Sequence, residues 1–310
     1  MKKIVILFNL FVCIATAKAQ DLYSKAYGDA KNPAMIFLHG GPGYSSAGFE
    51  ITTAQKLADQ GFYVVVYDRR GEGKSGELKS KYVFSEIFED LNALYNKYQL
   101  TSATLLGHSF GGVVATLFAE KNPQKVSSVV LIDAPVDIQQ TFKTILNSSR
   151  KIYQANNDKT NLAWLDKIEK MDPLFEEYAT YTFAHAMLNG FYTPKHMSNE
   201  AKKIYAEAAK NPDFRYMTEM NPEAPRGYLK SQKYTSIDIT KNLHTLLANQ
   251  VKVYGIYGQE DGLFSPEQVK TLEAIIGAKN VYYVPEASHN VFIDQQTLFL
   301  NFLKNQFKKK

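Results

Sequence analysis

The stretch LLGHSFGG sets Ser109 between two glycines, directly after a short apolar run. A strand that turns tightly into a helix around a serine forms a nucleophile elbow, which presents the hydroxyl for attack on a carbonyl carbon. Such a turn needs small neighbours, and Gly107, Gly111 and Gly112 meet this need. A plain strand-ending turn could show the same motif. Because a strand pattern precedes it and the helical pattern VVATLFAEKN follows, we predict that Ser109 is a nucleophile.

A serine hydroxyl is a weak nucleophile, so it requires a histidine base and an acid that orients this base. Of the six histidines, His289 lies in EASHNVF, after the last predicted strand and before the final predicted helix. Asp261 follows the predicted strand VKVYGIYG and precedes His289 in the chain. The order Ser, Asp, His is the one that accompanies an elbow of this kind. We therefore predict His289 as the base and Asp261 as the acid.

Other carboxylates compete with Asp261 for the role of the acid. Asp133 ends the predicted strand SVVLID, so it too would lie at a strand end close to the elbow. Asp68 ends an earlier predicted strand, and Glu260 is the immediate neighbour of Asp261. Asp133 is the principal alternative.

Acyl transfer also needs hydrogen-bond donors for the oxyanion, and the stretch HGGPG at 39–43 follows the first clear strand pattern. Its glycines let backbone N–H groups approach a reacting carbonyl, and Pro42 stiffens the turn. The predicted donors are the backbone amides of Gly41 and of Phe110, the residue after the nucleophile. A strand-ending turn without this role is the alternative.

The elements that must position these residues alternate between apolar runs and longer amphipathic segments. Continuous apolar runs are typical of strands in a parallel sheet that is covered on both faces. They occur at 35–38, 63–68, 103–107, 128–133, 251–258 and 280–285. Helical patterns between them cover approximately 50–60, 84–99, 111–122, 267–276 and 291–307. This alternation predicts βαβ units and an open α/β sheet.

The alternation breaks between Pro135 and Asn249, where prolines punctuate helical patterns at 162–171, 174–188 and 199–210. We predict a helical cap at 135–249, inserted into an α/β core of 20–134 and 250–310. Carboxylates of this cap that could hold a substrate ammonium group are Glu176, Glu177, Glu207, Glu219 and Glu223. Aromatic residues of the cap that could line an apolar pocket are Tyr178, Tyr181, Phe183, Phe191 and Tyr192.

Residues 1–19 have the layout of a secretory signal, because two lysines precede the apolar run 4–15 and an A-x-A site ends at Ala19. The run is too short to span a bilayer, which takes about 20 residues. A lipid anchor at Cys13 is the alternative, although Val12 is bulkier than the small residue that such processing favours. We predict export to the periplasm or the extracellular space.

Charge and cysteine content exclude several function classes. Cleavage after Ala19 removes the only cysteine, so the mature chain has neither a disulfide nor a cysteine nucleophile. Cleavage also removes three lysines and lowers the formal net charge from +5 to +2, which gives no reason to expect nucleic acid as a partner. The stretch GEGKSG at 71–76 matches the GxGxxG pattern of nucleotide-binding loops, but polar residues follow it instead of a helical pattern. No cluster of histidines or carboxylates has metal-ligand spacing. We expect neither a cofactor nor a metal.

HGGPG, DRRGEGKS at 68–75, GHSFGG and the placement of Asp261 and His289 together resemble the α/β-hydrolase superfamily. Within it they resemble the proline iminopeptidase branch of serine aminopeptidases, for which HGGPG is the most specific motif. The resemblance covers 30–133 and 250–307 and implies an α/β-hydrolase fold. That branch commonly carries GGSWG at the elbow, whereas this chain has His108 and Phe110 on either side of the serine. The motif GHSFGG is equally typical of esterases.

The predicted function is a secreted serine hydrolase that forms an acyl-enzyme. The leading substrate class is that of an aminopeptidase, which releases an N-terminal residue such as proline from a short peptide. A carboxylesterase, or another small-molecule hydrolase of this fold, is the alternative. A binding protein without turnover is the third hypothesis, but every catalytic position holds a competent residue.

Overall fold

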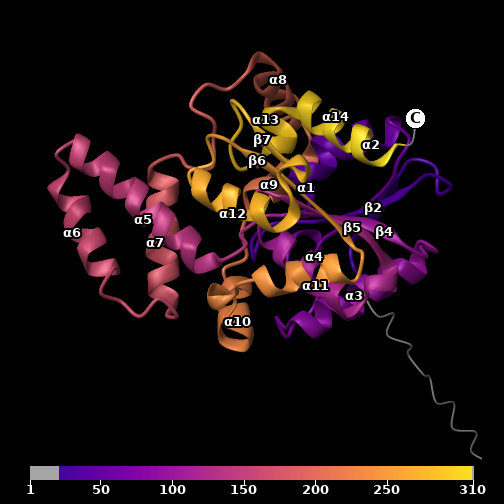
Figure 1. The fold of residues 1–310 in the computed structure, drawn as a ribbon, viewed down its shortest axis with the longest axis horizontal. Coiled ribbons are helices and arrows are strands. Elements are labelled where there is room, and N and C mark those ends of the chain that lie inside the picture. Colours follow the sequence, from indigo (N-terminus) through magenta and orange to yellow (C-terminus); the bar gives the residue numbers. More distant parts are fainter. Residues whose placement is uncertain (1–20, 309–310) are drawn as a thin grey trace, which may run out of the picture.

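The computed structural model describes residues 21–308, and its centre is a seven-stranded sheet (Figure 1). The strands are β1 (Ser24–Tyr27), β2 (Ala34–Leu38), β3 (Tyr63–Tyr67), β4 (Ala103–His108), β5 (Val126–Ile132), β6 (Lys252–Gly258) and β7 (Val281–Val284). Their order in the sheet is β1-β3-β2-β4-β5-β6-β7. Every neighbouring pair is parallel except β1 with β3. The predicted α/β fold with a mostly parallel sheet is confirmed.

The six strands that the apolar runs predict are all present, but strand β1 was not predicted. Its sequence SKAY contains no apolar run, and its residues are half-buried or exposed. It pairs antiparallel with β3 at the edge of the sheet, with Ser24 opposite Tyr67. An edge strand need not bury both of its faces, so it can lack the pattern that marks the central strands.

Alternate residues of the strands enter two hydrophobic cores, one on each face of the sheet. Leu105 belongs to the first core, and its neighbour Leu106 belongs to the second. The first core is covered by α3 (Phe84–Lys97), α4 (Phe110–Lys121), α11 (Thr240–Ala248) and α12 (Pro266–Ile276). The second is covered by α1 (Ala47–Phe49), a π-helical turn (Glu50–Ala54), α2 (Gln55–Asp59), α13 (Val291–Asp294) and α14 (Gln296–Phe307). Burial on both faces explains the continuous apolar runs.

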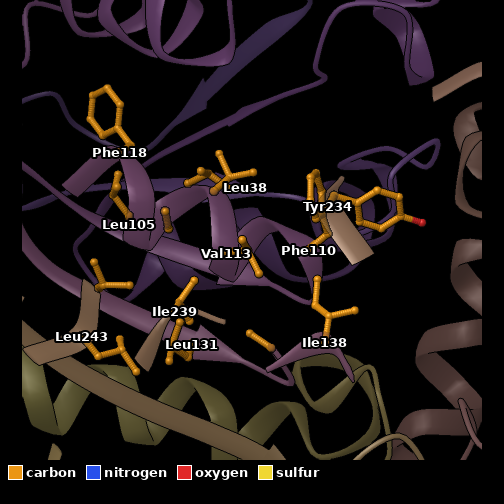
Figure 2. Close-up of a cluster of buried hydrophobic side chains, with 14 of the residues drawn as sticks. Leu38, Leu105, Phe110, Val113, Phe118, Leu131, Ile138, Tyr234, Ile239 and Leu243 are labelled. Carbon is orange, nitrogen blue, oxygen red and sulfur yellow. The ribbon is translucent and has the colours of Figure 1, made fainter. Parts of the chain in front are cut away.

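Part of the first core is shown in Figure 2, where side chains of the sheet meet side chains of the helices that cover it. They include Leu38, Leu105, Leu131, Val113 and Leu243. Phe110, the first residue of α4, lies beside Tyr234 in the same view, with ring centroids 5.6 Å apart. The first core therefore extends from the sheet to the edge at which β4 turns into α4.

Between β5 and β6 the chain forms helices: α5 (Ile138–Ala155), α6 (Lys159–Ile168), α7 (Glu176–Leu188), α8 (Asn199–Ala208), α9 (Arg215–Thr218), α10 (Glu223–Gln232) and α11. The helices predicted at 162–171, 174–188 and 199–210 correspond to α6, α7 and α8. Helix α5 begins after Asp137, whose carboxylate accepts a hydrogen bond from the N–H of Gln139 at 2.9 Å.

Helices α5, α6 and α7 pack against one another and form an arm that projects from the sheet (Figure 1). Helix α8 contacts α13, and α9 contacts α1, on the side of the second core. Helix α11 lies against α4, α12 and β6, so it covers the sheet although it falls within the predicted cap range 135–249. The limits of the cap stay a prediction.

The predicted signal at 1–19 lies outside the described residues. Among residues 21–308, every helix is too short or too polar to span a membrane.

Candidate active site

Ser109 lies at the turn from β4 into α4, with backbone angles of φ 51° and ψ −125° that non-glycine residues rarely adopt. Its N–H donates to the carbonyl of Ile132 at 2.9 Å, and its carbonyl accepts from the N–H of Gly112 at 2.9 Å. The turn leaves no room for a larger neighbour, since a Cβ on Gly111 would lie 2.1 Å from the carbonyl oxygen of Leu38. The glycines predicted for the elbow are therefore required by the close packing of α4 against the sheet.

His289 and Asp261 are joined by a hydrogen bond, with 2.8 Å between His289 Nδ1 and Asp261 Oδ2, and both side chains are buried. A carboxylate can only accept hydrogen bonds, so Nδ1 carries a proton, and in the neutral ring Nε2 has a free lone pair. The other oxygen of Asp261 accepts from the backbone N–H of Leu263 at 2.9 Å. This arrangement can present an imidazole as a proton acceptor.

The ring of His289 lies next to the elbow. Its centroid is 4.9 Å from that of His108, the residue before Ser109, and 6.3 Å from that of Phe264. Ser109 and Phe264 line the same cavity. Within residues 21–308, the hydrogen bonds do not include one between Ser109 Oγ and the His289 ring. Such contacts in hydrolases often tighten only when substrate binds.

His108 supports the backbone of His289 from the elbow. Its Nε2 lies 2.8 Å from the carbonyl oxygen of His289. Burial, with the neighbouring His289 ring, lowers the pKa of His108 to about 3, so the neutral ring donates its Nε2–H to this carbonyl. This role was not predicted, because the contact joins residues 181 positions apart and leaves no local pattern in the sequence.

Asp133, the rival acid, is fully buried at the end of β5, and its φ is 44°. Its Oδ1 accepts from the N–H of Gly258 at 2.8 Å, and its Oδ2 accepts from the N–H of Val291 at 3.4 Å. Burial and the nearby Asp261 raise the pKa of the Asp133 carboxyl well above its ordinary value. Both oxygens are thus engaged by backbone groups, while the ring of His289 bonds to Asp261.

The two remaining alternative acids also have partners elsewhere. Asp68 accepts hydrogen bonds from the N–H of Ser46 at 2.7 Å and from that of Lys74 at 2.8 Å. Glu260 accepts from the N–H of Lys195 at 2.5 Å. These contacts hold loops next to the sheet and leave Asp261 as the carboxylate that meets His289.

The HGGPG loop reaches the elbow at Gly41, which lines the cavity together with Ser109 and Phe110. The peptide bond from Gly41 to Pro42 is cis, and the φ of Gly41 is 113°, a conformation that favours glycine. The structure therefore brings both residues with predicted oxyanion donors beside Ser109.

The cavity at Ser109 is small, about 30 Å³, and its lining is almost entirely apolar. The lining residues are Gly41, Ser109, Phe110, Pro135, Ile138, Thr141, Phe183, Tyr234, Leu263 and Phe264. None of them is charged. Leu263 and Phe264 were not predicted to line a pocket, although their position two and three residues after Asp261 in the chain could have indicated it.

Of the cap aromatics, the structure brings two to the site. Phe183 lines the cavity, and the ring of Tyr192 packs edge-on against His289 with centroids 5.2 Å apart. Tyr178 and Tyr181 pack within the arm, against Phe142 and Trp164 respectively. The side chain of Phe191 packs directly against Gly262.

The cap carboxylates all lie on the surface and outside the lining of the cavity: Glu176, Glu177, Glu207, Glu219 and Glu223. Arg226 pairs with Glu176 at 2.7 Å and with Glu223 at 3.4 Å. The structure therefore does not bring these carboxylates to Ser109.

Within residues 21–308, no group of three or more His, Cys, Asp and Glu side chains is placed to hold a metal ion. Within the GEGKSG stretch at 71–76, Gly73–Ser75 forms a 3₁₀ turn, and Lys74 forms an ion pair with Asp213 at 2.5 Å. The amine of Lys74 thus joins the core to the segment before α9.

Asp294 is a second buried carboxyl near the base, and its Oδ2 accepts from the N–H of Ser288 at 2.9 Å. Burial raises its pKa from 3.8 to about 6. Between these two values the folded chain binds the proton more tightly than the unfolded chain, so ionisation of Asp294 lowers stability as pH rises. From pH 4 to 6, we expect the free energy of unfolding of wild type to fall by about 2 kcal/mol relative to that of Asp294→Asn.

Urea unfolding of both proteins at pH 4, 5, 6 and 7 measures this difference. The two curves should run parallel above pH 7, where Asp294 is ionised in both states of the chain. Parallel curves over the whole range would show that the carboxyl titrates normally.

The sequence profile of the family described as "alpha/beta hydrolase fold" matches residues 33–296. A proline iminopeptidase of Pestalotiopsis fici is 22% identical over 279 residues, which cover 89% of this chain and 92% of that protein. A proline iminopeptidase of Lacticaseibacillus rhamnosus is 24% identical over 274 residues, which cover 87% of this chain and 88% of the relative.

Among solved structures, a proline iminopeptidase-related protein of Thermus thermophilus is similar with a TM-score of 0.64 and 23% identity, covering 92% of each chain. An esterase of Exiguobacterium antarcticum is similar with a TM-score of 0.62 and 17% identity, covering 93% of this chain and 96% of the other. At these identities the structures establish the fold. The chain therefore belongs to the α/β-hydrolase family, and it is a hydrolase that resembles the proline iminopeptidase branch.

Proposed function

We propose that this chain is a serine hydrolase in which Ser109 is the nucleophile, His289 the base and Asp261 the acid that orients the base. The observation that carries the proposal is the hydrogen bond of 2.8 Å between His289 Nδ1 and Asp261 Oδ2, beside a serine on a strained elbow. This bond fixes the tautomer in which Nε2 can accept a proton.

In the proposed reaction, His289 Nε2 takes the proton of Ser109 Oγ while Oγ attacks the carbonyl carbon of the substrate. The backbone N–H groups of Gly41 and Phe110 stabilise the negative charge on the carbonyl oxygen. His289 then gives the proton to the leaving group, and an acyl group remains on Ser109. A water molecule, activated by the same Nε2, releases the acid and restores the serine.

The lining of the cavity supports a small, uncharged and apolar acyl group, so we propose carboxylic esters as the substrate class. A free ammonium group buried there would have no carboxylate partner, which is costly for an ion removed from water. The five cap carboxylates are exposed and lie outside the lining. An aminopeptidase that acts on N-terminal proline is the second candidate, and the names of the relatives and the HGGPG motif favour it.

The two candidates differ in how they respond to charge at the substrate's amino group. The assay compares 4-nitrophenyl acetate and butyrate with proline 4-nitroanilide, free and N-acetylated. We expect turnover of both esters, and no loss of turnover when the anilide is acetylated. In an aminopeptidase, acetylation would leave a buried carboxylate unpaired at a cost of about 3 kcal/mol, which is more than a hundredfold in rate. Such a loss would favour the second candidate.

We also propose that the protein is exported after cleavage behind Ala19, because residues 1–19 have the layout of a secretory signal. Mass spectrometry of the protein recovered from its native host tests this proposal, since the mature chain would begin at Gln20.

A further inference from the structure

Arg69 is among the largest fully buried side chains of the described residues, at 1% exposure, and the reaction above does not use it. It forms an ion pair with Glu72, which is also fully buried, at 2.9 Å between Arg69 Nε and Glu72 Oε1. A buried ion pair of this kind commonly gives no more stability than a well-packed apolar pair. The role of the pair is therefore indicated by the groups that it contacts, and its burial alone does not explain it.

Arg69 and Glu72 form hydrogen bonds with backbone groups of the HGGPG loop. Arg69 Nη1 donates to the carbonyl of His39 at 2.7 Å, and Nη2 donates to the carbonyl of Gly40 at 2.6 Å. Glu72 Oε2 accepts from the N–H of Gly43 at 2.6 Å. Two carbonyls and one amide on either side of Gly41 are thus fixed by one guanidinium and one carboxylate.

The hydrogen bond from Arg69 to the Gly40 carbonyl determines where the N–H of Gly41 points. In a trans peptide the C=O and the N–H lie in one plane and point in opposite directions. Because the Gly40 carbonyl points at Arg69, the N–H of Gly41 points away from Arg69, and Gly41 lines the cavity with Ser109. A cation on the carbonyl oxygen also favours the peptide's charge-separated resonance form, which makes the N–H a stronger donor.

The same guanidinium touches the residue that carries the other oxyanion donor. Its central carbon lies 5.4 Å from the centroid of the Phe110 ring, within the range of a cation–π contact. His39 adds a further donor on the loop: its Nε2 accepts from the backbone N–H of Arg69 at 3.1 Å, so Nδ1 carries the proton and donates to the Gly40 carbonyl at 3.0 Å. Arg69 thus contacts both segments that carry the predicted oxyanion donors, the HGGPG loop and Phe110.

We propose that Arg69, held in place by Glu72, is a positioning residue that aims and strengthens the N–H of Gly41 as an oxyanion donor. This role rests on the proposed serine hydrolase function. It acts through the peptide between Gly40 and Gly41, and the guanidinium does not touch the substrate.

The test uses the double variant Arg69→Met with Glu72→Gln, which leaves no unpaired buried charge and keeps an acceptor for the N–H of Gly43. We expect kcat for 4-nitrophenyl acetate to fall about 100-fold or more, the effect of losing one oxyanion donor, with little change in KM. The inhibition constant of phenylboronic acid, which mimics the tetrahedral intermediate, should rise in step with the loss of kcat/KM. A merely structural role would not move these two quantities together.

Arg70→Met with Asp90→Asn is the matched control, since Arg70 is the next residue and pairs at 2.6 Å with the buried Asp90, and the hydrogen bonds of Arg70 do not involve the HGGPG loop. It should leave kcat and the boronic acid constant unchanged. Arg69→Lys is the second variant and should show an intermediate loss, because one ammonium cannot replace the planar fork. Thermal unfolding of each variant reports whether it is folded.

A folded double variant with wild-type kcat and wild-type boronic acid affinity would overturn the proposal. Loss of cooperative unfolding in both Arg69 variants would assign Arg69 to stability alone and would overturn it too. An alanine variant of Ser109 that keeps full ester hydrolysis would instead contradict the proposed function, and the role of Arg69 with it.

Discussion

Replacing Ser109 with alanine is expected to abolish labelling by a fluorophosphonate probe and to lower kcat by about a million-fold, as removal of the nucleophile does in a serine protease. The reason is that the acyl-enzyme cannot form without the hydroxyl on the elbow. The residual rate would come from the oxyanion donors and from substrate binding alone. Gel fluorescence after labelling and a stopped 4-nitrophenyl acetate assay measure the two effects.

Ser127→Ala is the matched control, because Ser127 is an exposed serine on the neighbouring strand β5. It should label and turn over like wild type. Label that persists on the Ser109→Ala protein would assign the nucleophile to another residue. Because the cysteine lies within the predicted signal, a mature chain would offer no thiol to the probe.

Replacing Asp261 with asparagine is expected to lower kcat by about ten-thousandfold. The carboxylate accepts the Nδ1–H of His289, whereas an amide could donate to Nδ1 and hold the proton on Nε2 instead. A ring in that tautomer cannot accept the proton of Ser109. Steady-state kinetics of Asp261→Asn with the ester substrate, at a pH where wild type is most active, measure this loss.

Asp133→Asn is the control for this substitution. Asp133 bonds to the backbone amides of Gly258 and Val291, so its loss should act mainly on stability and change kcat far less than the loss of Asp261. If Asp133→Asn proved crippling and Asp261→Asn mild, the acid would be Asp133. Circular dichroism of both variants separates a folding defect from a catalytic one.

The parts of the site that could be predicted from the sequence are those fixed by local rules. Ser109 is marked by the glycines that the turn requires, and Asp261 and His289 each follow an apolar run that became a strand, β6 or β7. Parallel strands end at one edge of the sheet, so residues after successive strands meet there. The hydrogen bond between His289 and Asp261 agrees with this expectation.

The parts that could not be predicted depend on how distant segments dock. The exposure of Glu176 and Glu223 follows from the packing of the cap helices, which periodicity does not determine. The hydrogen bond of His108 to the His289 carbonyl and those of Arg69 to the HGGPG loop link separate strand ends through a few side-chain atoms. Strand β1 was missed because an edge strand needs no apolar run.

Strands β5 and β6 are neighbours in the sheet, although the whole helical segment lies between them in the chain. Closing a connection of about 120 residues costs about 2 kcal/mol more chain entropy than closing a crossover of about 15 residues. Contacts that join such distant segments form slowly, so this pairing should be a late step when the chain refolds. Until β6 docks, Asp261 and His289 cannot reach the elbow, so recovery of esterase activity should lag behind recovery of helical circular dichroism after dilution from denaturant.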